Sequence, residues 1–426
     1  MMNTERVRKL SRSHQNPIHG VSMPIRKLNY FCSMTAEQIF QQHLAPTSPH
    51  PLGLHIAKAE GVFLEDVHGK RYFDLISGIA VSNVGHRHPH VVAAIKNQVD
   101  QYLHVMAYGE FVQQPANALA ARLATLLPPS LSCAYFVNSG TEANEGALKL
   151  AKRITGRTEL IACHKSYHGS THGSLSVSGN EVKKKAFRPL LPAVRFIQFN
   201  NPDDLKQITT RTAAVIIETI QGDAGVRIPD GAYLHALRQR CTDVGAVLIF
   251  DEIQCGMGRT GKLFAFEHFG VVPDILTVAK AFGGGLPIGA FVSSWQHMQL
   301  NTHNPMLGHI TTFGGNPVCC AAALATLQVL TGSTLLADVD AKGQRFENWL
   351  RHPKVKAFRR IGLMMAVDFD SAERVQKIVL RALELGVICF WFLSHPYSFR
   401  LAPPLTISES EIDAACEKIR LAIDES

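Results

Sequence analysis

The sequence lacks several features that mark specialised classes of protein. Only 18% of its 426 residues are charged and 46% are hydrophobic, which argues against intrinsic disorder and coiled coil. Its nine cysteines include no C-x-x-C pair, so we expect neither a disulfide framework nor a zinc site. Scattered, reduced thiols are typical of a cytoplasmic protein, which is the predicted location.

No apolar run is long enough to suggest a membrane span. The longest uncharged segment, residues 313–337, is interrupted by a Gly-Gly-Asn-Pro turn, a glutamine and several threonines. A buried helix near residues 317–330 explains this segment better, and we expect no membrane partner. A G-x-G-x-x-G fingerprint is also missing, because the glycines at 283–285 are consecutive, so dinucleotide binding is not expected.

The net positive charge lies largely in the N-terminal tail. Residues 1–33 hold six basic side chains and one acidic side chain, which account for five of the eight net charges. No nucleic-acid fold signature accompanies them, so nucleic-acid binding is not expected. The tail has no apolar signal-peptide core. We predict a disordered extension, either a mis-assigned start before Met34 or a mitochondrial transit peptide.

Residues 75–330 alternate short apolar runs with amphipathic stretches. Helical patterns include residues 142–154 and 231–244. This alternation predicts an α/β fold whose large domain contains a mostly parallel seven-stranded sheet, covered on both faces. The seven predicted strands are rich in Val, Ile, Phe and Ala and lie at residues 134–137, 160–163, 194–199, 213–218, 246–251, 275–279 and 290–293.

The pattern changes to α+β after residue 330, which predicts a smaller domain over residues 331–426. Residues 34–74 contain two strand-like pieces and are predicted to join this small domain. The histidine-rich residues 86–90 are interpreted as a turn that opens a helix, so no metal site is predicted. The expected small-domain elements are helices at 341–350 and 371–385, strands at 362–369, 387–392 and 399–405, and a last helix with a Ser408-x-x-Glu411 capping box.

Residues 138–144, Asn-Ser-Gly-Thr-Glu-Ala-Asn, follow a predicted strand and open a helix. Ser139 and Glu142 have capping-box spacing, and Gly140 lets backbone N–H groups approach a ligand closely. Free N–H groups at the positive end of a helix dipole form an anion site, most naturally for a phosphate. An ordinary strand-to-helix turn is the alternative, since S-x-x-E is common.

Two charged residues end predicted buried strands. Asp251 closes the run 247–250, at the sheet edge where α/β proteins bind ligands. A buried carboxylate needs a cationic partner such as a protonated ring nitrogen; a helix cap or structural ion pair is the alternative. Lys280 follows the run 275–279. Desolvation would lower the pKa of its amine and make it nucleophilic, whereas a lysine reaching out to water is the alternative.

Together, a phosphate site, a strand-end carboxylate and a buried lysine are the groups needed to hold pyridoxal 5′-phosphate. From about residue 51 to its end, the sequence resembles the class III (ornithine-type) pyridoxal-phosphate aminotransferases. That resemblance implies the fold type I architecture of this cofactor's transferases and a transaminase activity. It rests on residues 139–144, Tyr-His-Gly at 167–169, Gln-Gly-x-Ala-Gly-Val at 221–226, Asp-Glu-Ile-Gln at 251–254, Lys280, Thr-Thr-Phe-Gly-Gly-Asn-Pro at 311–317 and Arg-x-Ala-Pro-Pro at 400–404.

The resemblance also implies roles for individual residues. Lys280 would form the Schiff base and then carry a proton, while Asp251 would keep the cofactor ring nitrogen protonated. Arg400 would hold a substrate carboxylate, with Asp223 as its gate. The other cofactor-binding positions would be Ser139, Gly140, Thr141, Tyr167, His168, Glu218, Gln254 and, from the second subunit of a homodimer, Thr312.

Three positions bear on the choice of substrate. Ser170 stands where many ornithine, acetylornithine and 4-aminobutyrate enzymes carry a carboxylate-binding arginine. Asp223 replaces a glutamate, and Ile79 stands where ornithine aminotransferases carry a substrate-contacting tyrosine. We therefore expect a ping-pong transfer from an ω-amino donor, ornithine or N-acetylornithine by default, to 2-oxoglutarate. Because of Ser170, a diamine or other ω-amine donor is the alternative.

The sequence favours two other functional classes of protein less strongly. An aminomutase of the glutamate-1-semialdehyde type is disfavoured by the retained Arg400 and Asp223. A non-catalytic cofactor-binding protein is disfavoured by the intact pair of Lys280 and Asp251.

Overall fold

The computed structural model describes residues 34–107 and 109–426, so the expectations for residues 1–33 lie outside the described residues. The chain divides into two compact units, residues 1–55 and 56–426. In the first unit, helix α2 (Ala36–His43) begins after Thr35, whose side chain forms a reciprocal capping box with that of Gln38. All elements named below belong to the second unit.

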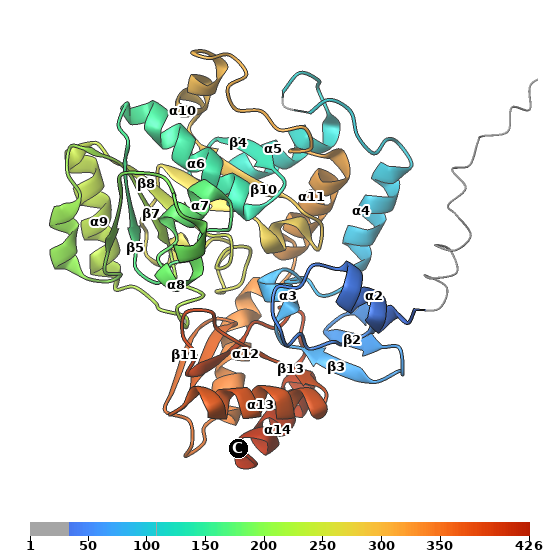
Figure 1. Cartoon of the computed structure of the whole chain (residues 1–426). Helices are drawn as coiled ribbons and strands as arrows, with labels where there is room; N and C mark the ends of the chain where they lie inside the picture. The colour runs from blue at the N-terminus through green and yellow to red at the C-terminus, as the bar shows by residue number, and fades with distance from the viewer. Residues whose placement is uncertain (1–33, 108) are drawn as a thin grey trace, which may run out of the picture. The chain divides into compact units, whose positions relative to one another are not determined.

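The second unit contains a seven-stranded sheet (Figure 1). Neighbouring strands from β9 through β8, β7 and β5 to β6 run parallel, whereas β10 is antiparallel to both β4 and β9. The predicted mostly parallel sheet is therefore confirmed. In spatial order the strands are β4 (Cys133–Val137), β10 (Gly289–Ser293), β9 (Ile275–Val278), β8 (Val247–Asp251), β7 (Thr212–Glu218), β5 (Glu159–Cys163) and β6 (Val194–Ile197).

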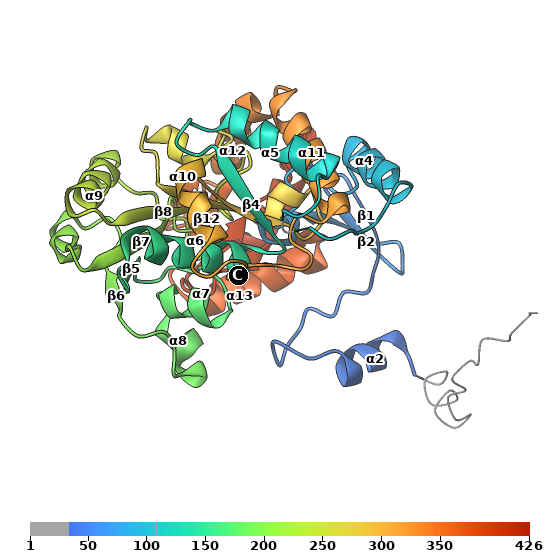
Figure 2. The ribbon, with the colours of Figure 1, turned by 90° about the horizontal axis from the view of Figure 1, so that it is seen from above.

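Alternate residues of the central strands face two different cores. In β7, Ile216 belongs to a buried cluster that includes side chains of α6 (Gly140–Thr155). The next residue, Ile217, belongs to a second cluster that includes side chains of α9 (Gly231–Val244). This alternation reflects a strand buried on both faces, which explains its nearly continuous apolar sequence. In both Figure 1 and Figure 2, α9 lies beside β7 and β8.

Shorter helices and 3-10 turns complete the part of the chain around this sheet. Helix α11 packs against α4 and α5, and α5 contacts β4. The buried α11 matches the helix predicted near residues 317–330. The remaining bounds are α3 (Ser77–Ala80), α4 (Pro89–Val99), α5 (Gln114–Leu126), α7 (His172–Val177), α8 (Glu181–Lys184), η1 (Lys185–Phe187), η2 (Pro202–Gln207), η3 (Ala265–His268), η4 (Lys280–Gly283), α10 (Trp295–Gln299), η5 (Leu300–Thr302) and α11 (Pro317–Thr331).

Two four-stranded sheets contain the remaining strands. The first has the order β1 (Ile56–Glu60), β2 (Phe63–Asp66), β3 (Arg71–Asp74) and β13 (Val387–Ile388). The second has the order β11 (Ala357–Ile361), β12 (Met364–Asp368), β15 (Ser398–Leu401) and β14 (Phe390–Trp391). The accompanying helices are α12 (Leu335–Trp349), α13 (Ala372–Glu384) and α14 (Glu409–Asp424), the last with the predicted Ser408 capping box.

The single strand predicted over residues 387–392 is wrong. The segment splits into β13, which pairs with β3, and β14, which pairs with β15 of the other sheet. Buried Cys389 lies between the two. A continuous apolar run carries no periodic signal that could reveal a change of sheet. The domain boundaries predicted after residues 74 and 330 stay predictions.

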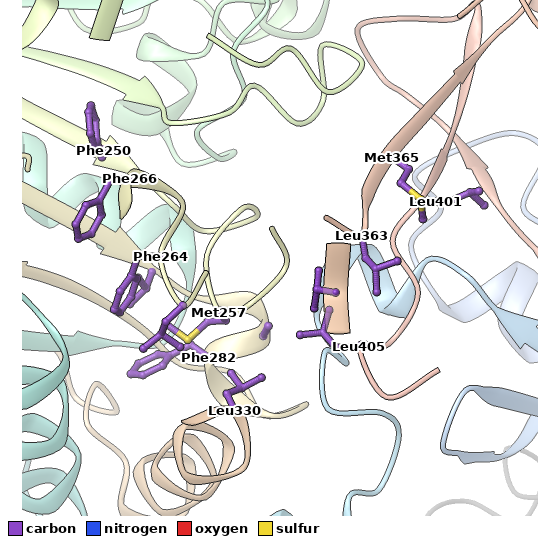
Figure 3. Packing of buried hydrophobic residues seen from close by; sticks show 14 of the residues in the cluster. Phe250, Met257, Phe264, Phe266, Phe282, Leu330, Leu363, Met365, Leu401 and Leu405 are labelled. Atoms are coloured by element: carbon purple, nitrogen blue, oxygen red, sulfur yellow. The ribbon is translucent and has the colours of Figure 1, made fainter. Parts of the chain in front are cut away.

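One buried cluster extends from the large sheet to the second small sheet. Figure 3 shows the rings of Phe264 and Phe282 near Met257, with Phe250 and Leu405 further along the same cluster on opposite sides. Because a packed apolar core resists rearrangement, this cluster holds the loops after β8 and β9 against the elements that follow β15.

Within the described ranges, no single helix has both the length and the apolar composition needed to cross a membrane. The bent pair α11 and α12, with an angle of 72° between its helices, meets the length and composition criterion only when the two are taken together.

Candidate active site

A cavity of about 490 Å³ lies at the carboxyl ends of the parallel strands. Three charged residues from neighbouring strands line it: Glu218 ends β7, Asp251 ends β8, and Lys280 follows β9 by two residues. This edge is where open α/β sheets bind ligands. Other predicted site residues that line the same cavity are Ser139, Gly140, Thr141, Tyr167, His168, Ser170, Asp223 and Gln254.

Helix α6 begins at this cavity. Ser139 Oγ accepts a hydrogen bond from the Glu142 N–H at 3.3 Å, as the capping-box spacing predicts. The Glu142 carboxylate instead accepts from the Asn138 N–H at 2.7 Å, so the reciprocal half of the predicted box is wrong. Across the described chain, the N–H groups of Gly140 and Thr141 find no protein acceptor, which leaves them available to an anion.

The Asp251 carboxylate is held from three directions. Its Oδ2 accepts hydrogen bonds from Asn144 Nδ2 at 2.8 Å and from His168 Nδ1 at 2.7 Å. Its Oδ1 accepts from the Ile253 N–H at 3.0 Å. Because a carboxylate only accepts, we assign the His168 proton to Nδ1. Asp251 is only 4% exposed, so these bonds fix it where little water can replace them.

Asn144 is fully buried and uses both ends of its amide. Nδ2 also donates to the His168 carbonyl at 2.7 Å, and Oδ1 accepts from Thr277 Oγ1 at 2.8 Å. These bonds determine the orientation of the amide. Sequence reasoning missed Asn144 and Thr277 as site residues. Asn144 lies inside the quoted motif, but its spacing could not show that the side chain meets Asp251.

Lys280 lines the cavity and is half-buried. Its ammonium forms no ion pair or hydrogen bond with any residue that the structure describes. Desolvation lowers the pKa of Lys280, although the carboxylates of Asp251 and Glu218 act in the opposite direction. The backbone at Lys280 has a φ of 48°, a left-handed conformation that is uncommon for a residue with a side chain. Such strain clusters at functional sites.

Glu218 is a buried carboxyl with two backbone donors. Its oxygens accept from the Tyr167 N–H at 3.0 Å and from the Gly222 N–H at 2.9 Å. Desolvation raises the pKa of Glu218 to about 7, with a smaller contribution in the same direction from the Asp251 charge and an opposing one from His168. Glu218 therefore titrates near neutral pH beside the cavity.

Arg400 and Asp223 form a buried ion pair at one side of the cavity. Arg400 Nη2 donates to Asp223 Oδ1 at 2.7 Å, and the guanidinium lies over the Phe392 ring, 4.5 Å from its centre. The Arg400 Nε is buried without a partner among the described residues. Burial lowers the pKa of Arg400, against the influence of Asp223. An arginine with an unused donor is suited to a planar carboxylate.

Tyr167 faces the cavity rather than the core, since it is 41% exposed. Its hydroxyl lies 3.3 Å from Ser170 Oγ. Between them, Gly169 has a φ of 128°, and a Cβ there would overlap Thr141. Glycine at this position therefore allows the Tyr167 loop to approach the start of α6.

Three predicted site residues do not line the main cavity. Arg400 and Ile79 line a smaller neighbouring cavity, which shares Gln254 with the main one. Thr312 is exposed on the loop before α11. In the described ranges, no group of three or more His, Cys, Asp or Glu side chains could hold a metal ion. His86 instead bonds Asp74 at 2.8 Å, and His88 caps α4.

The residues of the main cavity fit pyridoxal 5′-phosphate. The free N–H groups at the start of α6 suit a phosphate. The anchored Asp251 suits a protonated ring nitrogen, and the unpaired Lys280 suits an aldehyde.

We expect the cofactor-free protein to lose stability as the pH rises from about 4.5 to about 7, because folded Glu218 holds its proton over this range. The raised pKa corresponds to at most about 3 kcal/mol of unfolding free energy. Glu218→Gln cannot titrate, so urea unfolding at several pH values will show a flatter dependence for this variant. The exposed Glu417→Gln is the control, and equal slopes for Glu218→Gln and the wild type would contradict the assignment.

Known proteins resemble this chain over most of its length. The family model "Aminotransferase class-III" matches residues 44–423. An acetylornithine aminotransferase of Bacillus subtilis (strain 168) is 40% identical over 378 residues, which cover 87% of this chain and 95% of that protein. One from Methanocaldococcus jannaschii is 40% identical over 373 residues, covering 84% and 90%, respectively.

Solved structures agree with this result. The ornithine aminotransferase of Toxoplasma gondii ME49 superposes with a TM-score of 0.85 at 28% identity, covering 95% of this chain and 98% of that one. An (S)-enantioselective ω-transaminase from Thermomicrobium roseum gives a TM-score of 0.82 at 28% identity, covering 91% and 97%. The chain therefore belongs to the class III aminotransferases and is a transaminase that depends on pyridoxal 5′-phosphate.

Proposed function

We propose that the protein transfers an amino group from N-acetylornithine, or less readily ornithine, to 2-oxoglutarate. The observation that carries this proposal is the single cavity that brings together unpaired Lys280, anchored Asp251 and the free start of α6. Relatives at 40% identity are named acetylornithine aminotransferases, and a structural neighbour is an ornithine aminotransferase, which supports an ω-amino donor.

The cofactor would be held by four groups of the main cavity. The N–H groups of Gly140 and Thr141 would bind its phosphate, with Ser139 capping the same helix turn. Asp251 would bind its ring nitrogen, and the Tyr167 ring would cover its face. When bound, pyridoxal 5′-phosphate supplies an electron sink for the carbon that loses or gains the amino group.

Three further residues would support the cofactor. Gln254, which lines the cavity, would donate to the ring hydroxyl. His168 would act through Asp251, to which it donates at 2.7 Å. Glu218 would lie close to both cofactor and substrate, and its pKa of about 7 lets it hold or release a proton near neutral pH.

Lys280 would be both the covalent anchor of the cofactor and the proton carrier. Desolvation lowers the pKa of its ammonium, which increases the neutral amine available at physiological pH. The neutral amine can accept a proton from the substrate carbon and return it on the other side of the transfer.

Arg400 would bind a carboxylate of 2-oxoglutarate and of glutamate. In the described chain it is paired with Asp223 at 2.7 Å, so an incoming carboxylate must replace that partner. Such an exchange lets one site accept a charged substrate in one half-reaction and a different donor in the other. Ile79, which lines the small cavity beside Arg400, would contact the substrate chain.

A half-reaction on the cofactor-loaded protein tests the donor. One amino compound is added at a time without a keto acid, and the visible absorption of the bound cofactor is followed. We expect glutamate and N-acetylornithine to abolish the band, and Lys280→Ala to slow this change by roughly 10²–10⁴-fold, the usual contribution of acid–base catalysis. A response to putrescine but not to N-acetylornithine would replace the proposed donor with a diamine. No response to any amino compound would favour the aminomutase.

We also propose that the protein acts as a homodimer in which Thr312 completes the phosphate site of the partner. The loop that contains Thr312 lies beside the loop that contains Leu103, because Asn316 Nδ2 donates to the Leu103 carbonyl at 3.1 Å. Their exposed apolar side chains suit a protein–protein interface. These are Leu103, Met106, Phe111, Val112, Met306, Leu307, Ile310 and Phe313.

Mixed dimers test this arrangement. Lys280→Ala and Thr312→Asp should each be inactive alone, the second because its carboxylate repels a phosphate. Co-folded in equal amounts, they should regain about one quarter of the wild-type activity, since half of the dimers are mixed and hold one intact site each. If Thr312 served its own subunit, the mixture would stay inactive.

We propose a cytoplasmic location as well. All eight cysteines in the described ranges are free thiols, which agrees with a reducing compartment.

A further inference from the structure

A second cavity, of about 310 Å³, adjoins the proposed active site. It shares three lining residues with the main cavity, namely Tyr167, Ser170 and Asp223. The small Ser170 side chain lies at this junction, with its Oγ 3.3 Å from the Tyr167 hydroxyl. A substrate whose reacting end lies beside Lys280 could therefore extend past Ser170 into the second cavity.

The second cavity has both apolar and polar walls. Phe187 and Leu393 line it and are 57% and 48% exposed, so they present apolar surface that a ligand can cover. Asn180 lines it as well, and its Nδ2 donates to Ser394 Oγ at 2.9 Å. With Nδ2 engaged, the amide is held in place beside the apolar surface.

The unpaired charge of this cavity is positive. Its carboxylate, Asp223, is already engaged by Arg400 at 2.7 Å and by Ser394 Oγ at 3.2 Å. Lys183 lines the cavity and forms no ion pair with any described carboxylate. Glu181, the acidic residue nearest to it in sequence, pairs instead with Lys184 and Arg188.

The short helix α8 holds Lys183 at this position. The adjacent Lys184 points inward, where its ammonium donates to the Ser178 carbonyl at 2.9 Å and lies 4.1 Å from the centre of the Phe196 ring. Asn180, just before α8, is tied to Ser394. These contacts anchor both ends of α8 and so fix the backbone that carries the exposed Lys183 along the wall of the cavity.

We propose that the second cavity binds the far end of the amino donor and that Lys183 determines specificity by binding its carboxylate. The donor class is then an ω-amino acid with a neutral N-acyl group, which Phe187 and Leu393 would cover. This inference rests on the proposed function and specifies which of the possible amino donors the enzyme prefers. A diamine would place its second ammonium near Lys183, where like charges repel, and ornithine would bring an α-ammonium there.

Donor specificity and ligand binding in Lys183 variants test the proposal on the cofactor-loaded enzyme. The variants are Lys183→Glu and Lys183→Arg, and Lys185→Ala is the matched control because Lys185 is exposed two residues away and does not line the cavity. kcat/KM is measured for N-acetylornithine and putrescine. The Kd of N-acetyl-L-norvaline, which has the same skeleton without the reacting amine, is measured by calorimetry.

We expect Lys183→Glu to lower kcat/KM for N-acetylornithine and to raise the Kd of N-acetyl-L-norvaline by about 10–100-fold, as for the loss of a charge-assisted hydrogen bond. The same variant should raise kcat/KM for putrescine, while Lys183→Arg and Lys185→Ala stay within about 3-fold of wild type.

Unchanged donor preference and Kd in Lys183→Glu, with a wild-type melting temperature, would overturn the inference while leaving the transaminase assignment intact. Failure of the wild type to use any ω-amino donor would instead overturn the proposed function.

Discussion

The proposed active site depends on how one buried carboxylate is held. Asp251 ends a central strand, where only 4% of it is exposed. Asn144 and His168 donate to the same oxygen, at 2.8 and 2.7 Å, and Thr277 fixes Asn144 from behind. These donors hold the carboxylate at a fixed point, as its proposed contact with a protonated ring nitrogen requires.

The other charges of the cavity are organised around that point. Burial lowers the pKa of Lys280 and raises that of Glu218 to about 7, so Glu218 is able to exchange a proton near neutral pH. Arg400 and Asp223 pair at 2.7 Å, and under our proposal a substrate carboxylate replaces Asp223 in this pair. The second cavity adds Lys183, whose unpaired charge gives our donor proposal a structural basis. Under our proposal, donor selectivity thus depends on which charges remain unpaired.

Much of this site could be predicted from sequence because its main residues occupy marked positions. Lys280 and Asp251 each end an apolar run, and the buried strands themselves follow from composition. The contact of Asn144 with Asp251 could not be predicted, since it joins residues that are 107 positions apart. The split of residues 387–392 between two sheets also escaped prediction, because pairing partners leave no periodic trace in a short apolar run.

The affinity of Asn144→Ala for pyridoxal 5′-phosphate tests the central claim most directly. Loss of a hydrogen bond to the buried charge should raise the Kd of the cofactor at least about 10-fold, while the exposed Asn97→Ala leaves it unchanged. Melting temperatures of the cofactor-free variants separate this effect from misfolding. A folded Asn144→Ala protein with wild-type affinity and an unchanged absorption spectrum of the bound cofactor would contradict the account.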